Sequence, residues 1–199
     1  MPENNKLAEP SDSDSSLRTD RLLLREYQPS DAPVIERLLN DRQIASNTWS
    51  IDYPYPKGKA AKWIESQNAL RLTGDAYAFA ICVTDEGFAP YLIGALGLEI
   101  NKGDHSAEIG YWIGRKYWNQ GYCTEACRPL LDFAFERLGL RRVTSRHLAR
   151  NPASGRVLEK LGFKREGLRR KHARKWGVFE DVVVYGLLAE DERPRATRA

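Results

Sequence analysis

Cysteine is scarce in this sequence of 199 residues, and the three that occur, Cys82, Cys123 and Cys127, are odd in number. They do not fall into paired Cys/His spacings, which argues against both a disulfide framework and a zinc site. We therefore expect reduced thiols and no bound metal. No apolar run reaches the roughly 18 residues that a membrane span needs, and the first residues lack a basic segment followed by an apolar one. We expect a cytoplasmic protein without a membrane partner.

The common nucleotide-binding motifs are missing too. The sequence contains no GxxxxGK[ST], and no GxGxxG follows an expected strand. The charge excess is small, with 31 Lys and Arg against 27 Asp and Glu, for a formal net charge of +4. Such an excess suits an anionic nucleotide cofactor as well as it suits nucleic acid. The densest basic run, residues 169–175, has no aromatic residues interleaved as stacking platforms, so nucleic acid is the least favoured partner.

The length and the 42% of hydrophobic residues are enough for one domain with its own core. Residues 1–16 are rich in Pro, Asn, Ser and Asp, and we expect them to form a disordered leader. A single folded domain is expected to cover residues 17–189. A polar stretch at 190–199 is expected to be a flexible tail.

Hydrophobic periodicity predicts a mixed α/β fold. Apolar residues with strand character recur in seven segments, and three more segments have helical spacing. A further helix is expected to begin after Pro29, capped by Asp31. We expect a loop at 43–56 and another, holding the basic run, between the last two strands. The expected strands are 22–27, 76–83, 91–100, 106–113, 141–148, 163–166 and 179–188, and the other helices are 57–72, 123–138 and 153–161.

Residues 107–126 form the most informative segment, because a strand there runs through a short glycine-containing loop into a helix. This arrangement directs backbone N–H groups and the positive end of a helix at one spot, which favours a bound anion. Gly121 permits a positive φ angle or close approach of a ligand. Thr124 can cap the helix or donate to a phosphate, and Arg115 and Lys116 add positive charge nearby.

Three ordered motifs resemble the GCN5-related N-acetyltransferase (GNAT) superfamily, and within it the RimJ/RimL-like branch. L-x-T-x-R-L-x-L-R…D-A matches residues 17–32, W-x-x-G-[YI]-x-[TS]-E-A matches residues 118–126, and N-x-x-S…L-G-F matches residues 151–163. The resemblance covers about residues 17–188. The general acetyl-CoA loop of the superfamily, [QR]-x-x-G-x-[GA], matches only at its central glycine. Cys123 stands in place of a smaller residue, and Pro129 should kink or delay the following helix.

The resemblance implies a GNAT-like α/β (α+β) fold. Its sheet would be mixed and mostly antiparallel, with about seven strands splayed in the middle and helices on both faces. Acetyl-CoA would lie in the opening between the strands that end at Ile113 and begin near Arg141, held by backbone pairing as an added strand would be. Asn151 would orient the pantetheine arm or cap the helix that follows it. The implied cofactor-binding residues are Trp112, Ile113, Asn119, Gln120, Gly121, Tyr122, Cys123, Thr124 and Asn151.

The implied reaction is direct attack of a neutral primary amine on the thioester. A backbone N–H near Trp112 or Ile113 would stabilise the developing oxyanion. Glu108 is the candidate base, directly or through water, although it can equally be a solvated or salt-bridged strand carboxylate. Leu158 occupies the position where many family members have a tyrosine. Ser154 is then the candidate acid for the leaving thiolate, or a cap for its helix.

The acceptor is less well defined by the sequence. Trp49, Tyr53 and Tyr55 fall where the family has an acceptor-side loop, and they are candidate substrate-binding residues or core aromatics. The basic balance favours a protein or peptide N-terminus over a small cationic amine such as a polyamine, amino acid or aminoglycoside. A non-catalytic CoA-binding regulatory module is the other alternative, and a homodimer is possible.

Overall fold

The computed structural model describes residues 16–194. The expected leader therefore lies outside the described residues except for Ser16, and so do residues 195–199 of the expected tail. Ser16 belongs to a short strand and not to a leader. Within the described range, no helix is long and apolar enough to cross a membrane.

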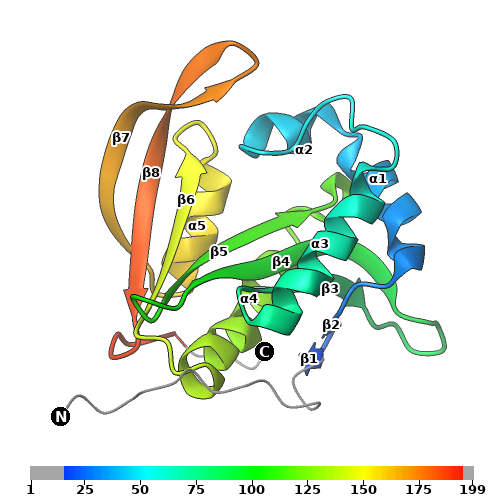
Figure 1. The fold of residues 1–199 in the computed structure, drawn as a ribbon, viewed down its shortest axis with the longest axis horizontal. Helices are drawn as coiled ribbons and strands as arrows, with labels where there is room; N and C mark the ends of the chain where they lie inside the picture. The colour runs from blue at the N-terminus through cyan, green and yellow to red at the C-terminus, as the bar shows by residue number, and fades with distance from the viewer. Residues whose placement is uncertain (1–15, 195–199) are drawn as a thin grey trace.

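Eight strands form a single sheet in the order β1-β2-β3-β4-β5-β6-β8-β7 (Figure 1). All neighbouring strands are antiparallel except β5 and β6, so the prediction of a mixed, mostly antiparallel sheet is confirmed. The strand beyond the expected seven is the short β1. The strands are β1 (Ser16–Arg18), β2 (Leu22–Arg25), β3 (Ala76–Val83), β4 (Tyr91–Asn101), β5 (Ser106–Ile113), β6 (Arg142–Leu148), β7 (Lys164–Lys175) and β8 (Val178–Leu188).

Helices cover both faces of the sheet, as predicted, and divide the core in two. On β3 the side chains alternate, so Phe79 and Ile81 join a cluster with α4, while Ala80 and Cys82 join a cluster with α1 and α3. The helices are α1 (Ala32–Leu39), α2 (Arg42–Asn47), α3 (Lys59–Thr73), α4 (Tyr122–Asp132), continued by a π-helical turn at Phe133–Arg137, and α5 (Pro152–Lys160), with 3-10 turns at Pro29–Asp31 and Arg115–Tyr117.

The sheet opens between β5 and β6. The two strands pair over only three positions, from Ser106 opposite Arg142 to Glu108 opposite Thr144, and diverge beyond them. The ribbon separates visibly at this point (Figure 1). The predicted splay is confirmed, and it leaves the far half of β5 with a neighbour on one side only.

Three local predictions were wrong. Residues 43–47 of the expected loop at 43–56 belong to α2, which Asp41 caps by accepting hydrogen bonds from the backbone N–H groups of Gln43 and Ile44. The basic run is not a loop but part of β7, which continues to Lys175. Asp31 does not cap α1 with its side chain, because its carboxylate accepts from Arg25 and from the backbone N–H of Gln28.

Pro129 neither delays α4, which already begins at Tyr122, nor ends it. The regular helix gives way to the π-helical turn four residues later, where the N–H of Leu138 donates to the carbonyl of Phe133.

Candidate functional site

A cleft of about 1130 Å³ lies at the opening of the sheet. Helices α1 to α3 and the loop after α2 line one side, β4 and β5 form its floor, and β6, α5 and the loop before α4 line the other side. Its size suits a cofactor-sized ligand together with part of an acceptor. Most of the predicted site residues line this cleft; Gln120 and Tyr53 do not.

Beyond Glu108, the backbone of β5 has no strand neighbour on the side of the opening among residues 16–194. The N–H of Gly114 donates to Ile93 on β4 at 2.8 Å, and backbone direction alternates along an antiparallel strand. The N–H of Trp112 is therefore directed at β4. The N–H groups of Tyr111 and Ile113 face the other way, into the opening.

Two side-chain contacts support this alternation. The hydroxyl of Ser145 donates to the carbonyl of Ile109 at 3.0 Å, from the β6 side. The indole N–H of Trp118 donates to the carbonyl of Ile113 at 2.7 Å. Both carbonyls belong to odd-numbered residues of β5, as expected if these residues face the opening. The resulting row of backbone groups can pair with an extended, amide-containing ligand.

The loop before α4 has the geometry of an anion site. Asn119 and Gly121 both have positive φ angles, 61° and 81°, and Gly121 is the N-cap of α4 without a side-chain cap. The first backbone N–H groups of the helix are therefore available to a ligand. Thr124 does not cap the helix, and within residues 16–194 its hydroxyl has no hydrogen-bond partner, so it can donate to a ligand. Gln120 turns its side chain away, since its amide donates to the carbonyl of Lys116.

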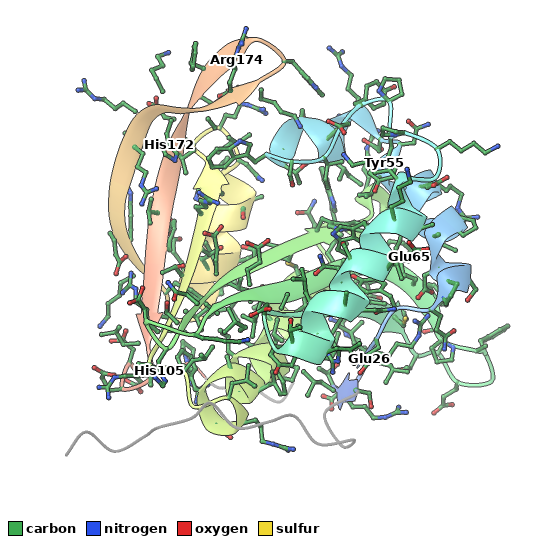
Figure 2. All side chains as sticks on the ribbon, in the orientation of Figure 1. Glu26, Tyr55, Glu65, His105, His172 and Arg174 are labelled. Carbon is green, nitrogen blue, oxygen red and sulfur yellow. The ribbon has the colours of Figure 1, made fainter. Side chains whose placement is uncertain are left out.

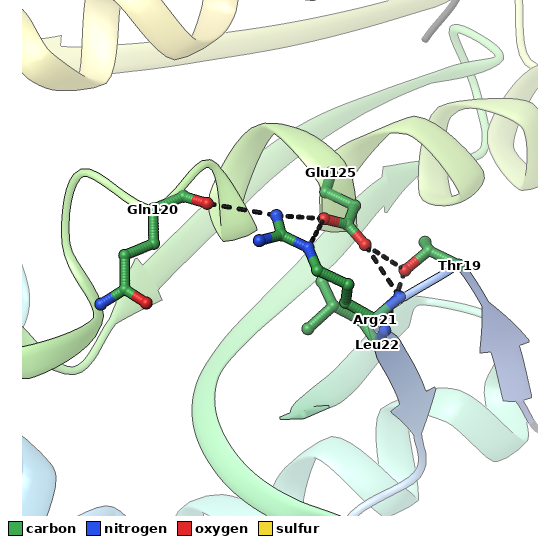
Figure 3. A network of polar contacts seen from close by, with 5 residues as sticks. All are labelled: Thr19, Arg21, Leu22, Gln120 and Glu125. Atoms are coloured by element: carbon green, nitrogen blue, oxygen red, sulfur yellow. Dashed lines mark hydrogen bonds and ion pairs between the residues drawn. The ribbon is translucent and has the colours of Figure 1, made fainter. Parts of the chain in front are cut away.

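A polar network that the sequence analysis did not anticipate fixes this loop to the N-terminal strands (Figure 3). Glu125 accepts hydrogen bonds from the hydroxyl of Thr19 at 2.6 Å and from Nε of Arg21 at 2.9 Å. The guanidinium also donates to the carbonyl of Gln120 at 3.1 Å and lies 4.5 Å from the centre of the Tyr122 ring. Thr19, Arg21 and Glu125 all belong to the quoted motifs, but only the fold brings them together.

The carboxyl of Glu125 is held in its charged form by this network. Partial burial would raise its pKa, but the hydrogen bonds from Thr19 and Arg21 outweigh the burial and lower the pKa below 4.5. The ionised carboxylate is thus the state that fastens the loop.

Ser154 contacts a tyrosine from an unexpected element. Its hydroxyl lies 3.1 Å from that of Tyr111 on β5, and the Tyr111 hydroxyl also lies 3.1 Å from the Ser154 carbonyl. Burial raises the pKa of Tyr111 well above its ordinary value of 10, so the phenol stays protonated. Leu158, in the usual tyrosine position, is fully buried in the core.

Asn151 caps α5, which was one of its two expected roles. Its side-chain oxygen accepts from the backbone N–H of Ser154, and its side-chain amide donates to the carbonyl of Asn47 at the end of α2. Ser154 is consequently not the cap of this helix, and its hydroxyl remains available for chemistry.

Glu108 forms an ion pair with Arg146 across the opening, with Oε1 and Nε 2.8 Å apart. The guanidinium of Arg146 lies 4.6 Å from the centre of the Trp49 ring. Both charged side chains are more than a third exposed. Glu108 thus lines the cleft on the side of α3, where Trp112 also packs, and Tyr111 and Ser154 lie on the opposite face of β5.

The three aromatic residues predicted to bind the acceptor do not all line the cleft. Trp49 and Tyr55 line the cleft, and Tyr55 is half-buried, which raises the pKa of its hydroxyl. Tyr53 is 42% exposed and lies outside the cleft. Figure 2 shows Tyr55 beside α3 and His172 on the β7–β8 hairpin, across the opening. The edge of the Trp49 ring meets the His172 ring with their centres 5.5 Å apart.

His147, to which the sequence analysis gave no role, is a buried residue of the cleft wall. Its Nδ1 lies 2.9 Å from the carbonyl of Leu148, while its Nε2 has no hydrogen-bond partner among residues 16–194.

The comparisons with known proteins agree with this geometry. A family model described as an acetyltransferase (GNAT) domain matches residues 21–164. The uncharacterized N-acetyltransferase p20 of Bacillus licheniformis is 33% identical over 88% of this chain and 97% of its own length. The [ribosomal protein uS5]-alanine N-acetyltransferase of Escherichia coli (strain K12) is 25% identical over 89% of this chain and 93% of its own.

A solved structure of RimL, a ribosomal L7/L12 alpha-N-protein acetyltransferase, in complex with coenzyme A superposes with a TM-score of 0.77. The match covers 85% of this chain and 95% of that chain at 22% sequence identity. This likeness concerns the fold.

Proposed function

The chain belongs to the GNAT acetyltransferase family, and on that premise we propose that this N-acetyltransferase takes its acetyl group from acetyl-CoA and transfers it to the α-amino group of a protein or peptide. The observation that carries the proposal is the splayed sheet, in which the backbone N–H groups of β5 that face the opening lead to the N-terminus of α4, where Gly121 provides no side-chain cap. The three free cysteines fit a reducing cytoplasm.

The residues present fit acetyl-CoA. The N–H of Tyr111 would pair with its pantetheine arm, and the loop from Asn119 to Thr124 would hold its pyrophosphate. Of the two predicted oxyanion donors, Ile113 is favoured over Trp112, because the N–H of Trp112 is directed at β4. Such a donor contributes about 3 kcal/mol to lowering the barrier.

The acceptor amine attacks the thioester carbon, and the carbon–sulfur bond breaks as the tetrahedral adduct collapses. Glu108, directly or through water, would take the proton released from the amine. The Ser154 hydroxyl would give a proton to the departing thiolate and take one from the phenol of Tyr111, 3.1 Å away, which solvent in the cleft would reprotonate. No covalent enzyme intermediate is required, since positioning alone makes this attack efficient.

The acceptor assignment rests on amine chemistry and on the relatives. Roughly a tenth of an α-amino group is neutral at pH 7, against roughly one in two thousand for a lysine, so an N-terminus needs little help from a base. The relative from Escherichia coli acts on a ribosomal-protein alanine, and the basic balance of this chain suits such an acceptor better than a cationic small amine.

Thiol release from acetyl-CoA, measured against a panel of amines, tests the proposal. The panel holds peptides beginning with Ser, Ala or Met, the same peptides with a blocked N-terminus and an internal Lys, and polyamines, amino acids and an aminoglycoside. Turnover confined to free N-termini is expected. Turnover only on small amines would replace the acceptor assignment, and binding of acetyl-CoA without turnover on any amine would favour the regulatory module.

The homodimer stays a prediction, which light scattering of the purified protein checks.

A further inference from the structure

The β7–β8 hairpin carries a dense group of exposed cations. The side chains of Arg169, Arg170, Lys171 and Arg174 are all exposed, and among residues 16–194 none of the four takes part in an ion pair. Arg170 and Lys171 lie in a bulge of β7, between Arg169 and Ala173, that displaces them from the ladder with β8, whereas Arg169 and Arg174 still pair with Val182 and Phe179. Their charge is thus directed at solvent.

Large apolar side chains are exposed on the same hairpin: Leu168, Trp176, Val178 and Phe179, at 45%, 48%, 60% and 56%. Together with the four cations they form what we call the hairpin surface. Charges and bulges on an edge strand also protect it from pairing with other chains. That role is served by charge of either sign and gains nothing from exposed apolar residues.

The hairpin is joined to the acceptor side of the cleft. The ammonium of Lys175, buried in spite of its charge, donates to the carbonyls of Trp49 and Ile51. Glu180 on β8 pairs with Arg150 at 2.7 Å. His172 meets the ring of Trp49. In Figure 2 Arg174 lies towards the hairpin tip and His172 nearer the body of the protein, so a chain that leaves the cleft at Trp49 would next meet the hairpin surface.

We propose that the hairpin surface binds an acidic segment of the protein whose N-terminus is acetylated, downstream of the residues that enter the cleft. This inference rests on the proposed protein acceptor. Carboxylates of such a segment would pair with the four cations, which have no ion-pair partner among residues 16–194.

A polypeptide fits this surface better than RNA does. The ring of Trp176 already lies under Arg42 and Lys175, with cation-to-centre distances of 5.6 and 5.4 Å. Phe179 lies 5.8 Å from the guanidinium of Arg174. Bases of a single strand need free aromatic faces to stack on, and here cations occupy them.

The test compares peptides that share one N-terminal segment and differ downstream, where they carry an acidic, a neutral or a basic stretch. We expect the acidic peptide to have a KM about tenfold lower than the neutral one, the combined effect of several exposed ion pairs, with little change in kcat. The advantage should disappear at high salt.

The double substitution R170Q/K171Q should remove most of this advantage and leave the neutral peptide unaffected. The matched control R18Q/R141Q removes the same charge from exposed arginines away from the hairpin, and it should keep the advantage. If both double variants lose the KM advantage of the acidic peptide equally, the effect depends only on net charge and the docking surface is refuted.

Fluorescence anisotropy of the labelled acidic peptide measures docking without turnover. Binding that R170Q/K171Q abolishes supports the surface even if no peptide is acetylated, in which case only the proposed function fails. Equal binding of acidic and neutral peptides overturns the inference. An R170Q/K171Q variant that keeps the preference for the acidic peptide also overturns it, even if part of that variant aggregates. Tight binding of single-stranded RNA in place of the acidic peptide would assign the surface to RNA.

Discussion

At the scale of single residues, a contact joins the hydroxyls of Tyr111 and Ser154, which are 43 positions apart in the chain, and we propose that the pair acts as one proton-donating unit. We expect Ser154→Ala and Tyr111→Phe each to lower kcat by about 10- to 100-fold, at the low end of general acid catalysis, with small changes in KM. Because the two hydroxyls act in series, the double variant should be little worse than the more damaging single one. Steady-state kinetics measures all three, and full turnover by Ser154→Ala would make water the acid.

Glu108 is the second residue whose role can be tested alone. If its carboxylate accepts the amine proton, Glu108→Gln should flatten the acid limb of the pH–rate profile and lower kcat/KM about 100-fold. The substitution also removes the ion pair with Arg146, so Arg146→Gln serves as the control. That variant loses the same pair and should retain the acid limb, whereas an acid limb unchanged in Glu108→Gln removes this residue from the mechanism.

At the scale of elements, the loop before α4 depends on the left-handed conformation of Gly121. A Cβ at this position would have room, with Arg21 as its nearest neighbour at 3.6 Å, so the cost of Gly121→Ala lies in the backbone. That cost is about 1–2 kcal/mol, and relaxation of the loop would misdirect the N–H groups at the start of α4. We expect the KM for acetyl-CoA to rise at least tenfold.

The chain supplies a control for Gly121→Ala. Gly139 has a similar φ of 64° and no atom near its missing Cβ, but it follows the π-helical turn and does not line the cleft. Gly139→Ala should lower stability by a similar amount and leave the KM for acetyl-CoA unchanged. Equal kinetic effects in the two variants would show that the loop geometry is unimportant for binding.

The Thr19–Arg21–Glu125 network connects β2 to α4 and makes stability depend on pH. The pKa of Glu125 is lowered in the folded protein, so its contribution is present above the unfolded value and is lost as pH falls through the folded one. We expect Glu125→Gln to lower the free energy of unfolding by about 1 kcal/mol at pH 7, a modest value because Arg21 is half exposed. The difference from wild type should shrink below about pH 4. Urea titrations across this range measure it, and a difference that does not change with pH contradicts the assignment.

Most elements were predictable from the sequence because their burial is regular. β3 and β4 are apolar runs, and the splay followed from motifs that lie on either side of it. β7 was partly missed because it is an exposed edge strand, whose sequence does not alternate between apolar and polar residues. α2 was missed because a helix of six residues is too short to show a helical period of apolar residues. The signal for α2 was Asp41, a capping residue just before it. Tyr111 could not be assigned, because its partner is fixed only when β5 and α5 meet.

At the scale of the whole molecule, the splay divides the sheet into two units, one of β1 to β5 and one of β6 to β8. Strand pairing joins the two units at only three positions, all between β5 and β6. A ligand that pairs with β5 and touches α5 would bridge the two units. A ligand that binds only the folded state raises the free energy of unfolding by about 2.7 kcal/mol when its concentration is one hundred times Kd. Acetyl-CoA should therefore raise Tm by several degrees, and by clearly less in Gly121→Ala than in Gly139→Ala.

Hydrogen exchange locates that bridge within the sheet. If acetyl-CoA pairs with β5, the amides of Tyr111 and Ile113, which face the opening, should exchange much more slowly in its presence. The amide of Trp112 is directed at β4, so it should already be protected without ligand and change far less. This alternation between neighbouring residues separates pairing in the splay from general stabilisation, which would slow all three alike. Equal slowing of the three amides would mean that the ligand acts from elsewhere, and the Ile113 N–H would then lose its place as the oxyanion donor.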